Sequence, residues 1–451
     1  MSLPRTTVAR GLSARALAGL LCVLSATLVL STGCKPDDGG DLPYDPFKPV
    51  PGGSGQQSDG GTASDGGSVV LSDGGSFEPK PTCASSSTSC AGACPDGGVV
   101  CAGNCGFLAP VMYALAGGAT NLAVGDLNGD GSADLVATTG DKVAVLLNQK
   151  NGRFQTPSLL PASGPSAVVL TNLDADPKLD LIVANSGGKT LAVYQGSGTG
   201  TFSSAGSIPT GSELNGLSPI TLSGGTQAIA VLRGDTQKVG VSKLNGLQPQ
   251  TAAEYDAASS PAAMVVDDFN QDGRQDIAVT HSQSCTPAEA RCQSVGVLLS
   301  NSDGTFQAQR FSATGGEPRG ILSADLNSDY IKDLVVTDAT GRKVLVMYGN
   351  GDGTFRTPAS YAVGLGPAKL VLADINRDSV PDLLVSNGGD NKVSLLPGIP
   401  GGTFGQQVAL TAYPQGVGLG GLAVEDFDGD GIRDMAIASS AGVQMLWGIC
   451  R

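Results

Sequence analysis

The chain has 451 residues, with 27 Lys and Arg against 41 Asp and Glu, which gives a formal net charge of −14. This balance excludes a nucleic-acid-binding protein, which needs a basic surface. A single His leaves little room for His-rich metal sites or for acid–base catalysis by His. Hydrophobic residues make up 40% of the chain, a globular content, and the sequence has no apolar run long enough to span a bilayer.

Residues 1–33 have the pattern of an export signal. Arg5, Arg10 and Arg15 precede an apolar stretch over residues 16–30, and small residues lead to Cys34. This arrangement resembles the bacterial lipobox, in which the Cys becomes the lipidated N-terminus, although Leu30 lies one position earlier than the usual Leu. The resemblance implies lipidation at Cys34, a membrane contact through the N-terminal lipid, and a location at the outer membrane or cell surface. An ordinary secretory signal with an incidental Cys34 is the alternative.

Residues 34–82 are rich in Gly, Ser, Asp and Pro and contain the tetrapeptide Ser-Asp-Gly-Gly three times. Such a composition cannot bury enough apolar surface to fold, so we expect a flexible, disordered linker. The repeated tetrapeptide could also be a weak cation site, but a plain linker explains it. A Cys-rich segment follows over residues 83–105.

The remainder of the chain, residues 106–451, is repetitive. A nine-residue acidic segment occurs at 126–134, 172–180, 268–276, 325–333, 374–382 and 426–434. The interval between copies is 46 to 57 residues, except for one of 96, which is two periods. The copy missing from that interval is expected near residues 222–231, where an apolar strand remains without the carboxylates. The sequence therefore predicts seven units.

Each unit has the same predicted elements. One apolar strand enters the acidic loop and a second leaves it, a polar turn leads to a third strand, and a Gly-rich turn with a Phe opens a fourth. Four short strands in about 48 residues are typical of a β-propeller blade. The fold class is therefore all-β, a seven-bladed β-propeller.

The last unit ends after its third strand, at residues 443–448. Residues 106–114, which precede the first unit, match the fourth-strand segment 354–362 in their Phe, Pro and Tyr positions. We therefore expect an N-terminal strand to complete the last blade, because closure removes exposed edge strands.

These units resemble FG-GAP (VCBS) repeats, which are known from the integrin alpha-chain propeller and from many bacterial surface proteins. The resemblance covers residues from about 106 to 451, and six copies of one loop make it specific. It implies a seven-bladed propeller with calcium in the loops, on the face opposite the ligand. It does not define a function, since the family includes adhesion modules, lectins and some lyases.

The loop chemistry also points to a hard cation. Oxygen ligands at positions 1, 3, 5 and 9, with a backbone carbonyl at position 7, suit Ca²⁺, which takes six to eight oxygens in flexible geometry. The loops contain 19 of the 41 acidic residues, which would repel one another without cations. An Asp/Asn/Gly turn without metal is the alternative, but such a turn does not require a fixed Asp at position 9. We expect up to six Ca²⁺ ions with a structural role.

The predicted metal positions are the odd-numbered positions of the six loops. They are Asp126, Asn128, Asp130, Ser132, Asp134, Asn172, Asp174, Asp176, Lys178, Asp180, Asp268, Asn270, Asp272, Arg274, Asp276, Asp325, Asn327, Asp329, Ile331, Asp333, Asp374, Asn376, Asp378, Val380, Asp382, Asp426, Asp428, Asp430, Ile432 and Asp434. Position 6 needs a sharp turn, which Gly supplies in the first, fourth and seventh units. Pro177, Tyr330 and Ser379 do not supply it, so the second unit is expected to be the weakest site.

The cysteines suggest disulfides in an oxidising compartment. Cys285 and Cys292 flank an insertion in the fourth unit and are expected to pair. In the repeat alignment Cys450 matches Pro400 and Cys105 matches Gly402, so Cys450 is expected to bond Cys105, or Cys101, across the closure seam. The pairing of Cys83, Cys90, Cys94 and Cys101 stays open.

Two function classes follow. The first is a non-enzymatic, calcium-stabilised surface module for adhesion or protein interaction, with an unknown protein or glycan as partner. The second is a polysaccharide-binding lectin or lyase, which convergent Arg, Lys, Tyr or His in the central cavity would favour. The tripeptide 233–235 (Arg-Gly-Asp) is predicted to be an ordinary turn. The turn after His281 is a candidate recognition loop, and His281 is expected to be a polar rim residue.

Overall fold

The computed structural model describes residues 99–100, 105–174, 176–283, 291–411 and 418–450. The export signal, Cys34, the linker 34–82, Cys83, Cys90, Cys94, Cys101 and Cys285 lie outside the described residues. Within the described ranges no helix is long and apolar enough to cross a bilayer.

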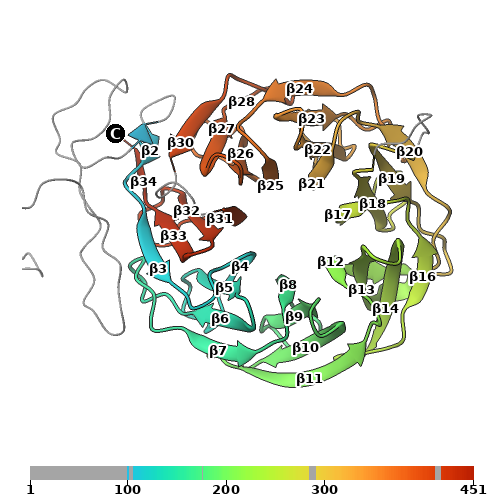
Figure 1. The fold of residues 1–451 in the computed structure, drawn as a ribbon, viewed down its shortest axis with the longest axis horizontal. Coiled ribbons are helices and arrows are strands. Elements are labelled where there is room, and N and C mark those ends of the chain that lie inside the picture. The colour runs from blue at the N-terminus through green and yellow to red at the C-terminus, as the bar shows by residue number, and fades with distance from the viewer. Residues whose placement is uncertain (1–98, 101–104, 175, 284–290, 412–417, 451) are drawn as a thin grey trace, which may run out of the picture. The chain divides into compact units, whose positions relative to one another are not determined.

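Seven antiparallel sheets are arranged around a central axis, and each sheet is one blade (Figure 1). The first three blades contain β4 (Leu122–Gly125), β5 (Asp134–Thr138), β6 (Lys142–Leu146) and β7 (Ser158–Pro161); β8 (Pro165–Thr171), β9 (Asp180–Asn185), β10 (Thr190–Gly196) and β11 (Phe202–Pro209); and β12 (Leu214–Leu222), β13 (Thr226–Arg233), β14 (Lys238–Asn245), β15 (Gln248–Pro249) and β16 (Ala253–Asp256). The fourth and fifth contain β17 (Pro261–Asp267), β18 (Asp276–His281), β19 (Ser294–Leu298) and β20 (Arg310–Ala313); and β21 (Pro318–Ala324), β22 (Asp333–Asp338), β23 (Lys343–Met347) and β24 (Ala359–Ala362).

The sixth blade contains β25 (Pro367–Ala373), β26 (Asp382–Asn387), β27 (Lys392–Leu396) and β30 (Val408–Thr411). The seventh contains β31 (Leu419–Glu425), β32 (Asp434–Ser439), β33 (Gly442–Leu446) and β3 (Val111–Ala114). The strand that precedes the first blade in sequence therefore forms the outer edge of the last one, as the repeat pattern predicts.

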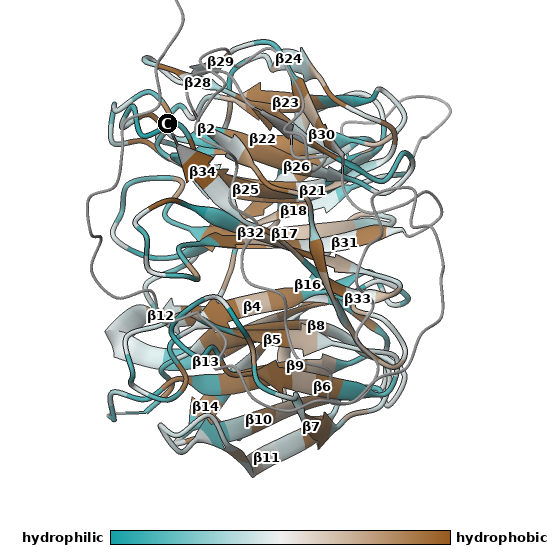
Figure 2. Ribbon diagram, turned by 90° about the vertical axis from the view of Figure 1, so that its left-hand side faces the viewer, coloured by the Kyte–Doolittle hydropathy of each residue, from teal (hydrophilic) through white to brown (hydrophobic). Residues whose placement is uncertain are grey.

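The first strands of the blades form the inner wall of the ring. Each of β4, β8, β12, β17, β21, β25 and β31 contacts the next, and β31 contacts β4, so the ring is closed. The second strands carry the core. Every residue of β5, β9, β18, β22, β26 and β32 is buried. Figure 2 shows apolar colouring along these strands and polar colouring in the loops at their ends.

Aromatic side chains fill the seam between the seventh and first blades. Tyr113 of β3 packs edge-on against Phe154, with ring centroids 5.3 Å apart, and Phe154 packs against Phe427 at 5.8 Å. Trp447 joins the same buried cluster. These contacts bury apolar area where an open propeller would expose its first and last blades.

A short hairpin-like pair accompanies the closure. In the sixth blade, β28 (Gly398–Ile399) pairs with β29 (Thr403–Phe404). In the seventh, β34 (Gly448–Cys450) pairs with β2 (Cys105–Phe107), which also pairs with β1 (Val99–Val100). The β34–β2 pair of the seventh blade is thus equivalent to the β28–β29 pair of the sixth. In the sixth blade a turn connects the two strands, whereas in the seventh the strands come from opposite ends of the propeller sequence, as the repeat alignment predicts.

The third unit keeps its first two strands without an acidic loop, as expected, and the short 3-10 turn η1 (Ser223–Gly225) joins them. The expectation that a Phe opens each fourth strand is correct only for Phe202. Phe154, Phe306 and Phe355 instead form isolated bridges to the second residue after the third strand, and the fourth strand begins later.

Candidate functional site: six acidic loops on one face

The six acidic loops connect the first strand of a blade to the second, so they all lie at the same end of the barrel-like ring wall. Each loop begins where an inner strand ends, and its last residue begins the buried second strand. The repeat therefore places six clusters of side-chain oxygens on one face of the propeller.

The position-1 carboxylate organises the loop backbone. In the first loop, Oδ1 of Asp126 accepts hydrogen bonds from the amides of Gly129 and Asp130 at 2.8 and 3.1 Å, and Oδ2 accepts one from Gly131 at 2.8 Å. The bonds from positions 5 and 6 recur at Asp268, Asp325, Asp374 and Asp426. Five of the six loops therefore share one geometry around this carboxylate.

The side chains at positions 3 and 5 face each other. Asn128 Nδ2 donates to Asp130 Oδ2 at 3.2 Å, and Asp130 Oδ1 accepts from the amide of Ser132 at 2.9 Å. Each loop is numbered here by its blade, and the third blade has none. The same amide–carboxylate pair forms in the fourth, fifth and sixth loops. Backbone hydrogen bonding lowers the pKa of Asp130, so this carboxyl is ionised and available as an oxygen ligand at neutral pH.

The position-9 carboxylate has a structural task that sequence reasoning missed. Asp276 is fully buried; its Oδ2 accepts from the amide of Phe269 at 3.1 Å and its Oδ1 from that of Ser300 at 2.7 Å. It thereby ties the start of the loop to the end of the third strand. The equivalent bonds recur in the other five loops. A fixed Asp at position 9 is therefore required by the blade itself, and it does not by itself indicate a metal.

Burial of these carboxyls affects their ionisation. Desolvation raises the pKa of Asp276 to about 6, and the same cause raises the pKa of Asp134, Asp180, Asp333 and Asp382. Repulsion by the carboxylate at position 5 of the same loop adds to this shift in all five cases. A cation in the loop would oppose both effects.

The glycine criterion for position 6 is wrong for two loops. Tyr330 and Ser379 have φ values of 65° and 69°, in the left-handed region that Gly131, Gly273 and Gly431 also occupy. Their amides make the same bonds to the position-1 carboxylate, at 2.9 Å each. The fifth and sixth loops therefore accept the strain of a non-glycine residue and keep the shared geometry.

The second loop does differ, as expected. Pro177 has no amide hydrogen to donate to position 1, and the Asn172 side chain instead donates to the carbonyl of Asp176. Asp174 Oδ2 accepts from Gln195 Nε2 at 3.0 Å, and Lys178 pairs with Asp176 at 3.2 Å. Its oxygens are thus engaged by donors from the protein.

The seventh loop has the densest group of carboxylates. It is the one loop of the six with Asp at all four of positions 1, 3, 5 and 9. Oxygens of Asp426, Asp428 and Asp434 lie within 4.8 Å of one another, a grouping that is unique among the described residues. In the fourth loop, by contrast, Arg274 pairs with Asp272 and so competes with a cation. The structure therefore favours the seventh loop over the fourth as a metal site.

Of the two features predicted for the opposite rim, the placement of His281 is wrong and the turn at residues 233–235 is as predicted. His281 is not a rim residue: it is fully buried at the end of β18, with its ring 5.8 Å from that of Phe311. Arg233, the first residue of the Arg-Gly-Asp tripeptide, is buried at the end of β13 and paired with Glu254. Its side chain belongs to the blade, which agrees with the prediction of an ordinary turn.

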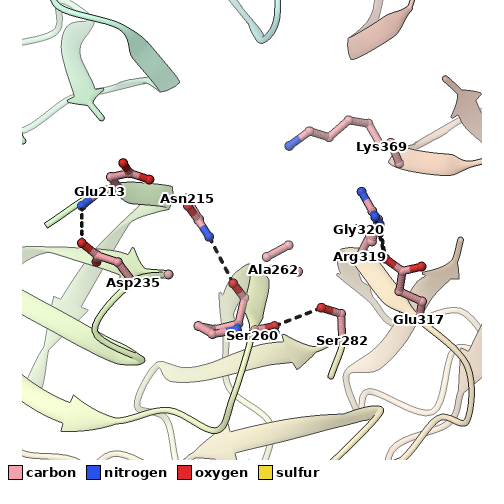
Figure 3. A pocket seen from close by; sticks show the side chains of 14 residues that line it. Glu213, Asn215, Asp235, Ser260, Ala262, Ser282, Glu317, Arg319, Gly320 and Lys369 are labelled. Carbon is pink, nitrogen blue, oxygen red and sulfur yellow. Dashed lines mark hydrogen bonds and ion pairs between the residues drawn. The ribbon is translucent and has the colours of Figure 1, made fainter. Parts of the chain in front are cut away.

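A polar cavity, not located from the sequence, opens on the inner wall at the face opposite the acidic loops. Its volume is about 560 Å³, and the starts of β12, β17, β21 and β25 line it. Figure 3 shows Lys369, Arg319 and Glu213 around this space. One feature of the sequence points to this cavity: Arg319 and Lys369 are charged residues in first strands whose other residues are apolar or small.

The arrangement as a whole is that of a closed seven-bladed β-propeller with acidic loops on one face. A model of the FG-GAP-like repeat matches residues 268–336, 325–385 and 374–437. Within the propeller, residues 268–437 therefore consist of FG-GAP-like repeats. None of the curated proteins matches its sequence.

The chain is similar to solved structures of other proteins. The chain is similar to BBS1N in a complex with ARL6DN, with a TM-score of 0.55 and 11% identity over 77% of this chain and 98% of that one. It is also similar to the virginiamycin B lyase from Staphylococcus aureus, with a TM-score of 0.49 and 13% identity over 75% and 98% of the two chains. At 11% identity the similarity to BBS1N shows a shared fold alone.

Proposed function

We propose that this protein is an exported, lipid-anchored propeller that binds calcium in its acidic loops and acts as a non-enzymatic adhesion or protein-interaction module. The observation that carries the proposal is the repetition of one oxygen-lined loop geometry around a closed ring of FG-GAP-like units. A closed ring is a rigid platform on which surface loops can be displayed.

Calcium is the cation that suits these loops best. Carboxylates and amide oxygens at positions 1, 3 and 5 supply hard ligands on a flexible backbone, which Ca²⁺ accepts more readily than Mg²⁺. The group at Asp426, Asp428 and Asp434 is the strongest candidate. Because each loop is tied to the third strand of its blade through position 9, a bound ion would brace the blade, and its role would be structural.

A metal titration tests this part of the proposal. The purified chain is depleted of metal with a chelator and titrated with Ca²⁺, and bound ions and the melting temperature are measured together. We expect four to six ions, about one per loop, and a rise in melting temperature. The absence of both bound ions and stabilisation would refute calcium binding.

The membrane anchor is a separate part of the proposal. It predicts that a labelled fatty acid is incorporated into the wild-type chain and that Cys34→Ser abolishes the labelling. A chain that is exported with its Cys34 thiol unmodified would instead support an ordinary secretory signal.

A polysaccharide-binding lectin or lyase is the second candidate. The observation in its favour is that Arg319 and Lys369 both line the inner cavity, which is the feature expected of such a site. Release of unsaturated products from uronic-acid polysaccharides, measured by ultraviolet absorbance, would favour the lyase over the interaction module.

A further inference from the structure

The inner cavity contains two charged side chains that have no partner in the described part of the chain. Lys369 lies in β25 and Glu213 immediately precedes β12, and neither side chain forms an ion pair or hydrogen bond with a described residue. The other cation, Arg319, donates to Oε1 of Glu317 at 3.0 Å through Nε. Figure 3 shows the Lys369 ammonium extended into the space that Glu213 and Asn215 face from the other side.

The environment of Lys369 is unusual for a surface lysine. Its side chain is exposed, but the solvent it meets is that of the cavity, and the surrounding protein lowers its pKa by desolvation. An anion bound beside it would restore favourable electrostatics for the ammonium. A neighbouring pocket of about 470 Å³ shares Glu317, Arg319 and Ala368 with the cavity, so the space continues past Arg319 along the inner wall.

We propose that this cavity binds a single carboxylate on a peptide segment of a partner protein, held by Lys369 and Arg319. The proposal rests on the function proposed above and specifies the partner chemistry. Lys369 would supply a point charge and Arg319 a directed donor, the combination that recognises a carboxylate.

The lining favours a peptide over a sugar acid. None of the described residues around the cavity is aromatic, so the stacking platform common in sugar sites is missing. Glu213, Asp235 and Glu317 place three carboxyls on the wall against two cations. A polyanion such as a polyuronate would be repelled by this excess, whereas one isolated carboxylate can avoid it.

Chemical protection of Lys369 is the experiment that tests the proposal. The full chain is acetylated at pH 8 with limiting reagent, and modification of each lysine is measured by mass spectrometry. The probes are N-acetyl-Gly-Glu-Gly-amide, its Gln counterpart, and digalacturonate. We expect the Glu peptide alone to slow acetylation of Lys369, and none of the probes to slow that of Lys142, an exposed lysine of β6.

Binding of the Glu peptide is then compared among variants. Lys369→Met should weaken binding about tenfold, the loss expected for one charge-assisted contact, whereas Lys142→Met should leave it unchanged. Equal protection by the Glu and Gln peptides, or no protection, would overturn the proposal. Protection by digalacturonate alone would overturn it in favour of a sugar-acid site. The melting temperature and calcium stoichiometry of the same samples report separately on the calcium part of the proposed function.

Discussion

Cys105 of β2 and Cys450 of β34 lie directly opposite each other in antiparallel register, although the whole propeller separates them in the sequence. Opposed Cα atoms in an antiparallel pair are about 4.5 or 5.5 Å apart, which is within the range that a disulfide spans. The backbone thus places these two residues where the repeat alignment predicts a bond.

We predict that Cys105 and Cys450 form a disulfide that fastens the closure seam. Peptide mapping without reduction should recover the two cysteines in one linked fragment. Cys450→Ser should lower the free energy of unfolding by several kcal/mol, up to about 5 in the chain-entropy model, and urea unfolding measures the change. A fragment linking Cys450 to Cys101 would contradict this pairing.

The seventh loop is predicted to hold calcium more firmly than the second. Asp426→Asn removes a charged ligand from the densest carboxylate group, so we expect one fewer bound Ca²⁺ per chain by equilibrium dialysis and elemental analysis. Asp174→Asn is the matched control, because Gln195 and Lys178 already engage the oxygens of that loop. An equal loss in both variants would show that the two loops are equivalent.

The position-9 residue is predicted to stabilise the fold without any metal. In Asp276→Asn one of the two oxygen acceptors becomes an NH₂ group, so the amide of Phe269 or Ser300 loses its partner. Leaving a buried donor unpaired costs about 1–3 kcal/mol, and this loss should appear in chelator, measured by chemical denaturation. Asp272→Asn, in the exposed part of the same loop, should change stability in chelator far less. If Asp276→Asn is harmless without calcium, position 9 serves the metal alone.

The burial of His281 predicts a loss of stability in acid. Desolvation lowers the pKa of His281 to about 4 from 6.5. Between these values the unfolded chain binds a proton that the folded chain does not, so stability rises with pH. As the pH falls from about 6.5 to 4, up to about 3 kcal/mol is lost.

The effect of His281 is best measured as a difference between two proteins. The raised pKa of Asp276 acts in the opposite direction, because there the folded chain binds more protons between pH 3.8 and about 6. His281→Asn places at this site the residue that the second and sixth blades have at Asn185 and Asn387. The stability of this variant relative to the wild type should increase as the pH falls, and a pH-independent difference would refute the prediction.

The ring was predictable because its period is strong. Six acidic loops and alternating strands specify the blades, and the matching Phe, Pro and Tyr of residues 106–114 identify the closing strand. Burial, in contrast, depends on tertiary packing that one sequence does not reveal. His281 aligns with polar residues at the end of second strands and so resembles a rim position, yet Phe311 and its neighbours cover it.

The chemistry of the site was only partly predictable. Loop oxygens are visible as residue types, but whether backbone amides already occupy them is a matter of geometry, as Asp276 shows. The glycine signal also failed for Tyr330 and Ser379, since the loop framework holds them at positive φ. The inner cavity is formed by the first strands of four blades, so it cannot be predicted from any one short segment of the sequence.

The pairing of Val111 with Met445 sets the order of events during synthesis. β3 is made before any complete blade, but its partner β33 is made after nearly all of the others. The growing chain must therefore carry an unmatched strand with two buried-type residues, Met112 and Tyr113, until translation of the propeller is almost finished. Contacts this distant in sequence form slowly, so ring closure is expected to be the last and slowest step of folding, when the nascent chain is most exposed to aggregation.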